Sequence, residues 1–126
     1  MSKYFIGSLL IMVVLISCKQ EIEKPKLFSH NHHIDIGKIN FDSTYLINFK
    51  IFNKGNAILI VDTITASCGC TIPTLAKKNI EPEDSAIIVA TYKPVDTGLF
   101  DKKLIVKSNT DSSFTVLSFH GQAIKY

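Results

Sequence analysis

Apolar and polar residues alternate along most of the chain from residue 30 onward. In the clearest segment, the apolar residues Tyr45, Ile47, Phe49 and Ile51 alternate with Leu46, Asn48, Lys50 and Phe52. A period of two places successive side chains on opposite faces of a strand, so this segment predicts a strand with one mainly apolar face. Alternation or a β-branched apolar run predicts further strands at residues 32–36, 57–64, 85–92, 100–107 and 114–123. No segment between them has a helical period over a useful length.

Turn-forming residues separate these predicted strands. Asn53-Lys54-Gly55-Asn56 predicts a turn from which residues 57–64 return as the second strand of a hairpin. Residues 94–98 predict another turn, residues 108–113 a hairpin loop, and residues 73–83, with two prolines, a loop that could cross between sheets. Several short strands joined by such turns are typical of an antiparallel β-sandwich of about 100 residues. The sequence therefore predicts an all-β sandwich domain over residues 30–126.

The first 17 residues have the pattern of an export signal. Lys3 supplies a positive charge, and residues 5–16 form an apolar stretch shorter than the ~20 residues that span a membrane. The sequence Leu15-Ile16-Ser17-Cys18 resembles a lipobox, the cleavage and acylation signal of bacterial lipoproteins. This resemblance predicts that residues 1–17 are removed and that Cys18 receives fatty acyl chains such as palmitate. The alternative is an ordinary signal peptide followed by an incidental cysteine.

Residues 18–29 are polar and contain Pro25, which predicts a tether between the lipid and the domain. The expected location is the bacterial cell envelope, with the membrane bound through the N-terminal lipid. Lys19 occupies the position where an aspartate would suggest inner-membrane retention in some bacteria, so the outer membrane is favoured over the inner one.

Composition restricts the classes of partner. Removal of residues 1–17 leaves 109 of the 126 residues, which is enough for one domain with its own core. The formal charge of the whole chain is only +3, and no basic cluster stands out, so no nucleic-acid partner is expected. All 14 basic residues are lysines, so the chain has no guanidinium group for bidentate binding of phosphate or carboxylate.

A series of short motifs resembles the bacterial domain of unknown function 1573. The motifs, in order over residues 34–124, are Asp35-Ile36-Gly37-Lys38-Ile39, Phe52-Asn53-Lys54-Gly55-Asn56, Ser67-Cys68-Gly69-Cys70-Thr71, Ile80-Glu81-Pro82-Glu83-Asp84, Gly98-Leu99-Phe100, Val106-Lys107-Ser108-Asn109 and His120-Gly121. The chain departs from the family at Pro82-Glu83-Asp84, where the family usually has Pro-Gly-Glu. The resemblance implies an immunoglobulin-like antiparallel β-sandwich, often on exported lipoproteins, and it implies no established reaction.

Cys68 and Cys70 are the candidate site for chemistry. In an extended strand their Cα atoms would lie ~6.6 Å apart, at the upper limit for a disulfide, and Gly69 can bring them closer. Three hypotheses remain open: a structural pair, a soft-metal site for copper or zinc, and a thiol-redox site. His32 and His33 could add metal ligands, although they point to opposite faces of a strand.

No arrangement typical of an enzyme is evident. Ser67 and Ser118 lack the Gly-flanked elbow of a hydrolase nucleophile, and His120 lies inside a predicted strand. No phosphate-binding loop is present and no cofactor is expected. The primary hypothesis is therefore a non-catalytic, lipid-anchored envelope domain that binds a protein partner through strand edges or end loops. The alternative is a soft-metal-binding or thiol-redox lipoprotein that uses Cys68 and Cys70.

Overall fold

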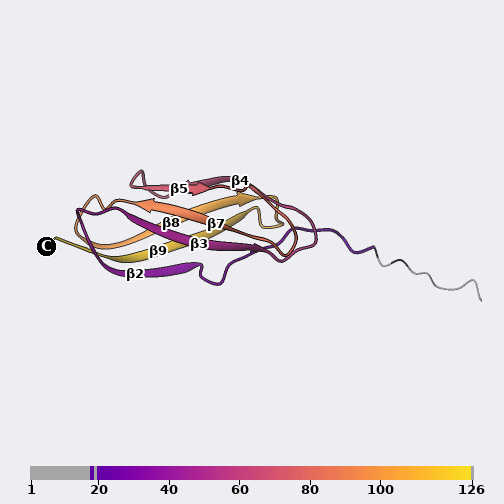
Figure 1. Cartoon of the computed structure of the whole chain (residues 1–126), viewed down its shortest axis with the longest axis horizontal. Helices are drawn as coiled ribbons and strands as arrows, with labels where there is room; N and C mark the ends of the chain where they lie inside the picture. The colour runs from indigo at the N-terminus through magenta and orange to yellow at the C-terminus, as the bar shows by residue number, and fades with distance from the viewer. Residues whose placement is uncertain (1–17, 19, 126) are drawn as a thin grey trace, which may run out of the picture.

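Two β-sheets stacked face to face form the domain (Figure 1). The computed structural model describes residues 18 and 20–125. Their strands are β1 (Leu27–Phe28), β2 (His33–Asn40), β3 (Tyr45–Asn53), β4 (Leu59–Ala66), β5 (Thr71–Leu75), β6 (Asn79–Ile80), β7 (Ser85–Tyr92), β8 (Gly98–Ser108) and β9 (Phe114–Ile124). One sheet has the order β1-β3-β7-β5 and the other β2-β9-β8-β4-β6. The all-β sandwich predicted from the sequence is confirmed.

The core lies between the two sheets and follows the predicted alternation. Ile47, Phe49 and Ile51 of β3 are buried, whereas Leu46, Asn48 and Lys50 on the other face are exposed. Leu59 and Val61 of β4 and Leu104 and Val106 of β8 close the core from the opposite sheet. Within the described residues no helix is long and apolar enough to cross a membrane.

The pairing of the strands differs from the prediction in three places. β3 and β4 lie in different sheets, so the turn after Asn53 crosses the sandwich and does not close a hairpin. β2 runs parallel to β9, so the second sheet is mixed and not wholly antiparallel. Residues 73–75, expected in a loop, belong to β5, which pairs with β7. An alternating pattern defines the buried face of a strand but not its neighbour, because hairpin and crossover bury the same residues.

The domain also begins earlier than expected. Leu27–Phe28 pairs with β3, and Ser29, placed in the predicted tether, is buried. Before β1, Lys24 and Lys26 lie against the turn after β3: the carbonyl oxygen of Lys26 accepts a hydrogen bond from Lys54 N at 2.8 Å, and that of Lys24 from Asn56 N at 3.0 Å. A tether can therefore include only the residues before Lys24. The predicted signal peptide (residues 1–17) and Lys19 lie outside the described residues.

Candidate functional site

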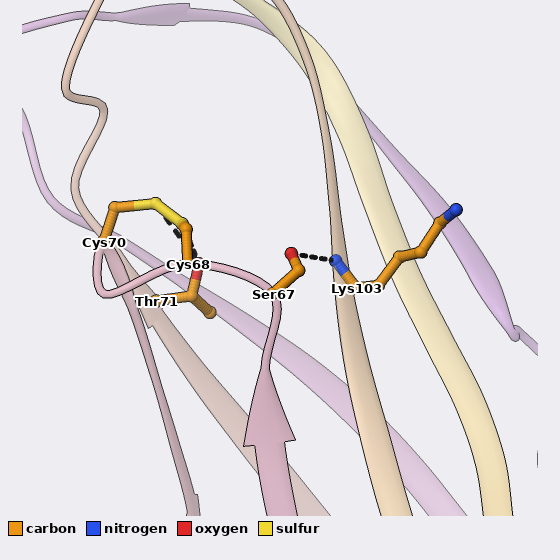
Figure 2. Close-up of a disulfide and its surroundings, with 5 residues drawn as sticks. All are labelled: Ser67, Cys68, Cys70, Thr71 and Lys103. Carbon is orange, nitrogen blue, oxygen red and sulfur yellow. Dashed lines mark hydrogen bonds between the residues drawn. A yellow bond between two sulfur atoms is a disulfide. The ribbon is translucent and has the colours of Figure 1, made fainter.

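Cys68 and Cys70 form a disulfide in the turn between β4 and β5 (Figure 2). Their Cα atoms are 5.3 Å apart, within the usual range for a disulfide. The turn is closed by the backbone N–H of Thr71, which donates to the carbonyl oxygen of Cys68 at 3.3 Å. Gly69 does not have a positive φ, so the turn does not require a left-handed residue there. In this state neither sulfur is a thiolate, so a soft metal could bind the pair only after reduction.

The hydroxyl of Thr71 lies against both sulfurs. Its oxygen is 3.8 Å from the Sγ atom of Cys68 and 3.9 Å from that of Cys70. Thr71 is only 4% exposed, so water has little access to this group. Among the described residues, the two sulfurs are the hydrogen-bond contacts of the hydroxyl. A buried hydroxyl in this place is available to donate to whichever sulfur becomes negatively charged.

An exposed apolar patch, formed by Leu46, Ile72 and Val95, borders the disulfide. The three side chains are between 60% and 73% exposed. Leu46 of β3 and Ile72 of β5 flank Thr91 of β7 in the pairing register. A shallow pocket of about 450 Å³ lies beside them, lined by Thr44, Gly69, Cys70, Ile72, Thr91, Lys93, Pro94 and Val95. The pocket therefore approaches the disulfide from the side of Cys70.

The edge of β4 is open over its second half. β6 pairs only with Leu59 and Ile60, so it covers just the beginning of β4. The backbone N–H of Ser67 donates to the carbonyl oxygen of Lys103 of β8 at 2.9 Å, and Lys103 N donates to the hydroxyl of Ser67 at 3.0 Å (dashed line in Figure 2). Because bonding alternates along an antiparallel pair, Ile64 and Ala66 direct their N–H and C=O groups away from β8. No hydrogen bond to these four groups is formed within the described part of the chain.

The edge of β5, in the other sheet, has fewer outward-facing backbone donors for pairing with a partner strand. The carbonyl oxygen of Cys70 accepts from Lys93 N at 3.1 Å, so by the same alternation the nitrogen of Pro73 faces outward. Proline in that place leaves the sheet intact and removes a donor from the edge, a common protection against unwanted pairing. Between the two edges lies a shallow groove of about 280 Å³ whose lining includes Ile64, Pro73, Leu75 and Lys78. Ile64 and Leu75 are half-buried and pack against the core.

The histidines of the N-terminal segment do not converge on a metal site. His32 is exposed, and its carbonyl oxygen accepts a hydrogen bond from Ser118 N at 2.8 Å. His33 stacks on His120 with ring centroids 4.3 Å apart, and its Nδ1 atom is hydrogen-bonded to the hydroxyl of Ser118. No group of three side chains able to hold a metal ion is found in the residues that the structure covers. His33 and His120 lie on β2 and β9, whereas the cysteines lie in the β4–β5 turn.

The histidine pair is a feature that the sequence analysis missed. The Nε2 atom of His120 lies 3.6 Å from a carboxylate oxygen of Asp35. The carboxylate of Asp35 therefore contacts His120, whereas the hydroxyl of Ser118 is hydrogen-bonded to His33. This is not the order of a hydrolase triad, in which one histidine joins the acid to the nucleophile. The parallel register pairs Asp35 with His120 across 85 positions of sequence, and no local motif indicates that contact.

Cys18 is exposed and free, as acylation of its side chain would require. The residues that follow it reach the sandwich at Lys24, where the backbone becomes hydrogen-bonded to the turn after β3.

Comparison with known proteins places the chain in a recognised family. The model of the family described as "Protein of unknown function (DUF1573)" matches residues 27–123. This range contains β1 to β8 and nearly all of β9, together with the disulfide turn. A search of curated proteins found no match.

Solved structures with a similar fold come from distant sources. A protein of unknown function from Porphyromonas gingivalis W83 superposes with a TM-score of 0.72 at 12% identity, over 79% of this chain and 47% of that one. This chain therefore spans about half the length of that protein. The seventh PapD-like domain of human CEP192 has a TM-score of 0.64 at 11% identity, over 91% and 96% of the two chains. The secreted serine protease VesC of Vibrio cholerae has a TM-score of 0.58 at 14% identity, but only 23% of that chain is matched. These likenesses support the sandwich fold alone.

Proposed function

The chain belongs to the DUF1573 family, and we propose that it is a non-catalytic, lipid-anchored domain of the bacterial cell envelope that binds a protein partner. The partner supplies an extended segment that pairs with the open edge of β4. The observation that carries this proposal is the unpaired backbone of Ile64 and Ala66. Two residues with free N–H and C=O groups can form the ladder of main-chain hydrogen bonds on which strand addition depends.

The surroundings of the β4 edge favour a partner segment that carries apolar side chains. Alternate side chains of an added strand would face the groove in which Ile64 and Leu75 lie half-buried against the core. Covering them would remove apolar surface from water, which favours binding. β5 cannot serve equally well, because Pro73 has no N–H to donate. The edge of β2 carries a bulge between Asp35 and Lys38, which also disfavours pairing.

Attachment of the domain to the membrane would depend on acylation of Cys18. The residue is exposed and separated from the first hydrogen-bonded residue of the sandwich, Lys24, by a short segment. A lipid on Cys18 would hold the domain close to the membrane surface, and two or more acyl chains would make this attachment durable.

Proline substitution tests the edge directly. Ala66→Pro removes an N–H that points away from β8, so no bond within the sheet is lost. Ala66→Ser keeps the N–H and is the matched control. A photo-crosslinking residue at Thr65, which is exposed, reports contacts at this edge in intact envelopes, and one at Asn48 on the outer face of β3 reports background. We expect a crosslinked product from position 65 that Ala66→Pro abolishes and Ala66→Ser preserves.

The same experiment can contradict the proposal. An equal product from position 48, or a product from position 65 that survives Ala66→Pro, would exclude strand addition at β4. Thermal unfolding of each variant shows whether the sandwich is intact. The intact mass of the mature protein tests anchoring separately: we expect an N-terminal acylated Cys18, and a mass without acyl chains would contradict it.

A further inference from the structure

We infer that the Cys68–Cys70 disulfide is a thiol–disulfide exchange site for a cysteine-bearing protein, and that Thr71 stabilises the thiolate released in the exchange. The inference rests on the disulfide turn and the pocket beside it, and it does not depend on strand addition at β4. It assigns a role to the buried hydroxyl of Thr71, which the sandwich fold alone does not explain.

A pocket leads to the disulfide from the side of Cys70. Gly69 and Cys70 line the pocket of about 450 Å³, whereas Cys68 does not. Both cysteines are half-buried, so it is the pocket that would direct an incoming thiolate to the Sγ atom of Cys70. Lys93, which also lines the pocket, places a positive charge on the approach and favours the thiolate form of the attacking group. The exposed side chains of Ile72 and Val95 offer an apolar contact for the residues next to the partner's cysteine.

The leaving sulfur is then Cys68, and Thr71 is positioned to receive its charge. The hydroxyl oxygen of Thr71 is 3.8 Å from that sulfur in the disulfide state. Release of the thiolate lets the hydroxyl donate a charge-assisted hydrogen bond, which is stronger than a bond to a neutral sulfur. A better-stabilised leaving thiolate leaves faster, so the hydroxyl accelerates the opening of the disulfide.

The exchange is balanced without a further oxidant. A partner thiolate attacks Cys70 Sγ, the bond between the two sulfurs breaks, and Cys68 leaves as a thiolate that takes up a proton. The partner's second thiol, after losing its proton, attacks the partner sulfur of this mixed disulfide and releases Cys70, which takes up a proton in turn. The partner dithiol is oxidised to a disulfide, and Cys68 and Cys70 are reduced to two thiols. The reverse sequence oxidises the pair again at the expense of a partner disulfide.

The reduced state is compatible with the fold. The disulfide joins residues only two positions apart, so opening it frees a very short loop. The turn keeps its backbone hydrogen bond from Thr71 N to Cys68 O, which does not involve sulfur. The pair can therefore cycle between its two states while the sandwich stays folded.

Glutathione is the probe for the chemistry. Full-length protein carrying Cys18→Ser leaves Cys68 and Cys70 as the only cysteines. We expect its disulfide to equilibrate with reduced and oxidised glutathione. We also expect the Cys68 thiol of the reduced protein, beside the Thr71 hydroxyl, to have a lowered pKa, measured from the pH dependence of its alkylation. Thr71→Val removes the hydroxyl at nearly constant volume and should slow reduction about tenfold and raise that pKa. Thr71→Ser keeps the hydroxyl and should behave like the parent protein.

A merely structural Thr71 would give a different result. Equal reduction rates and equal thiol pKa values for the parent and Thr71→Val would exclude the stabilising role. A disulfide that remains oxidised in a large excess of reduced glutathione would exclude exchange altogether. Thermal unfolding of each variant verifies that the comparison is made on folded protein.

Trapping in envelopes tests the direction of attack. In Cys68→Ser the second step within the pair is blocked, so a mixed disulfide between Cys70 and a partner should accumulate and disappear on reduction. Cys70→Ser should trap severalfold less, because its remaining thiol does not line the pocket. Equal trapping by the two variants, or none by either, would overturn the proposed attack at Cys70.

Discussion

The side-chain amide nitrogen of Asn53 donates a hydrogen bond of 2.9 Å to the backbone carbonyl oxygen of Ile80, and both residues are completely buried. The same nitrogen donates to the carbonyl oxygen of Ala57 at 2.7 Å. The amide oxygen accepts from the backbone nitrogens of Gly55, at 3.0 Å, and Lys26, at 3.3 Å. One side chain thus connects the end of β3, the crossover to β4, β6 and the segment before β1, and all four of its hydrogen-bonding positions are used.

Removing this amide should be among the most damaging single substitutions. Asn53→Ala leaves two carbonyl oxygens and two N–H groups without their partner, and we expect a loss of about 3 kcal/mol in the free energy of unfolding. Asn53→Asp should also destabilise, because a carboxylate cannot donate to Ala57 or Ile80 and would be buried. Urea unfolding measures both. Asn56→Ala, which removes a single exposed hydrogen bond from Lys24 N in the same turn, is the control and should cost much less. Equal losses at the two positions would contradict the role given to Asn53.

The turn between β6 and β7 has a residue that does not suit its conformation. Glu83 has φ of 66°, in the left-handed region, and the N–H of Asp84 donates to the carbonyl oxygen of Glu81 at 3.0 Å. A turn with Pro82 second and a left-handed residue third favours glycine at the third position. Glu83→Gly should therefore raise the free energy of unfolding by about 0.5–1 kcal/mol. Glu81→Gly, in the same turn but without a positive φ, should lower it, and a gain from both would point to another cause.

Much of the fold could be predicted because the alternation of apolar and polar residues indicates which face of each strand is buried. The apolar face of β3, the β8–β9 hairpin and the absence of helical periodicity were all present in the sequence. Alternation does not specify which strands pair. The sequence therefore predicts β4 beside β3 and an antiparallel sheet, whereas β3 and β4 lie in different sheets and β2 runs parallel to β9. Asn53 has the identity of a turn residue, and nothing in its local sequence indicates that its amide is buried and hydrogen-bonded to Ile80 of β6.

The candidate site was only partly predictable for the same reason. Cys68 and Cys70 are predictable as a site because two closely spaced cysteines are chemically distinctive. Their neighbour Thr71 is not chemically distinctive in this way. Its importance comes from the burial of its hydroxyl against both sulfurs. The contact of Asp35 with His120 depends on strand register, which a single sequence does not specify.

Acid conditions should affect the pairing of Lys77 with Asp84. Lys77 donates a hydrogen bond to the carboxylate of Asp84, and this contact, with a second hydrogen bond from Ser85 N, lowers the pKa of Asp84 below its usual value. The stabilisation is present above the unfolded-state pKa and is lost as pH falls through the lowered folded-state pKa. Lys77→Met should move the pKa of Asp84 upward in an NMR titration, whereas Lys78→Met should leave it unchanged. An unchanged pKa in Lys77→Met would show that the backbone bond alone is responsible.

Two glycines in turns should differ in their response to substitution by alanine. A Cβ atom on Gly55 would lie 2.7 Å from the nitrogen of Lys26 and 2.8 Å from the carbonyl carbon of Pro25, so Gly55→Ala must displace the segment before β1. A Cβ atom on Gly69 meets nothing within 4 Å, and the residue lacks a positive φ. We expect Gly55→Ala to destabilise by about 1–3 kcal/mol and Gly69→Ala to be nearly neutral. Faster proteolysis near residue 26 in Gly55→Ala would locate the damage, and equal stability of both variants would contradict close packing of this segment.

Simultaneous replacement of Cys68 and Cys70 by serine separates a structural role from a chemical one. A loop closed by residues two positions apart restricts the unfolded chain only slightly, which corresponds to about 1.5 kcal/mol of stability. The core residues buried between the sheets do not depend on the disulfide, so the double variant should remain folded with a modestly lower melting temperature. Circular dichroism and thermal unfolding, compared with the reduced parent protein, measure the loss. If the double variant failed to fold, the disulfide would be an essential structural element, and cycling between oxidised and reduced states in a folded domain would be excluded.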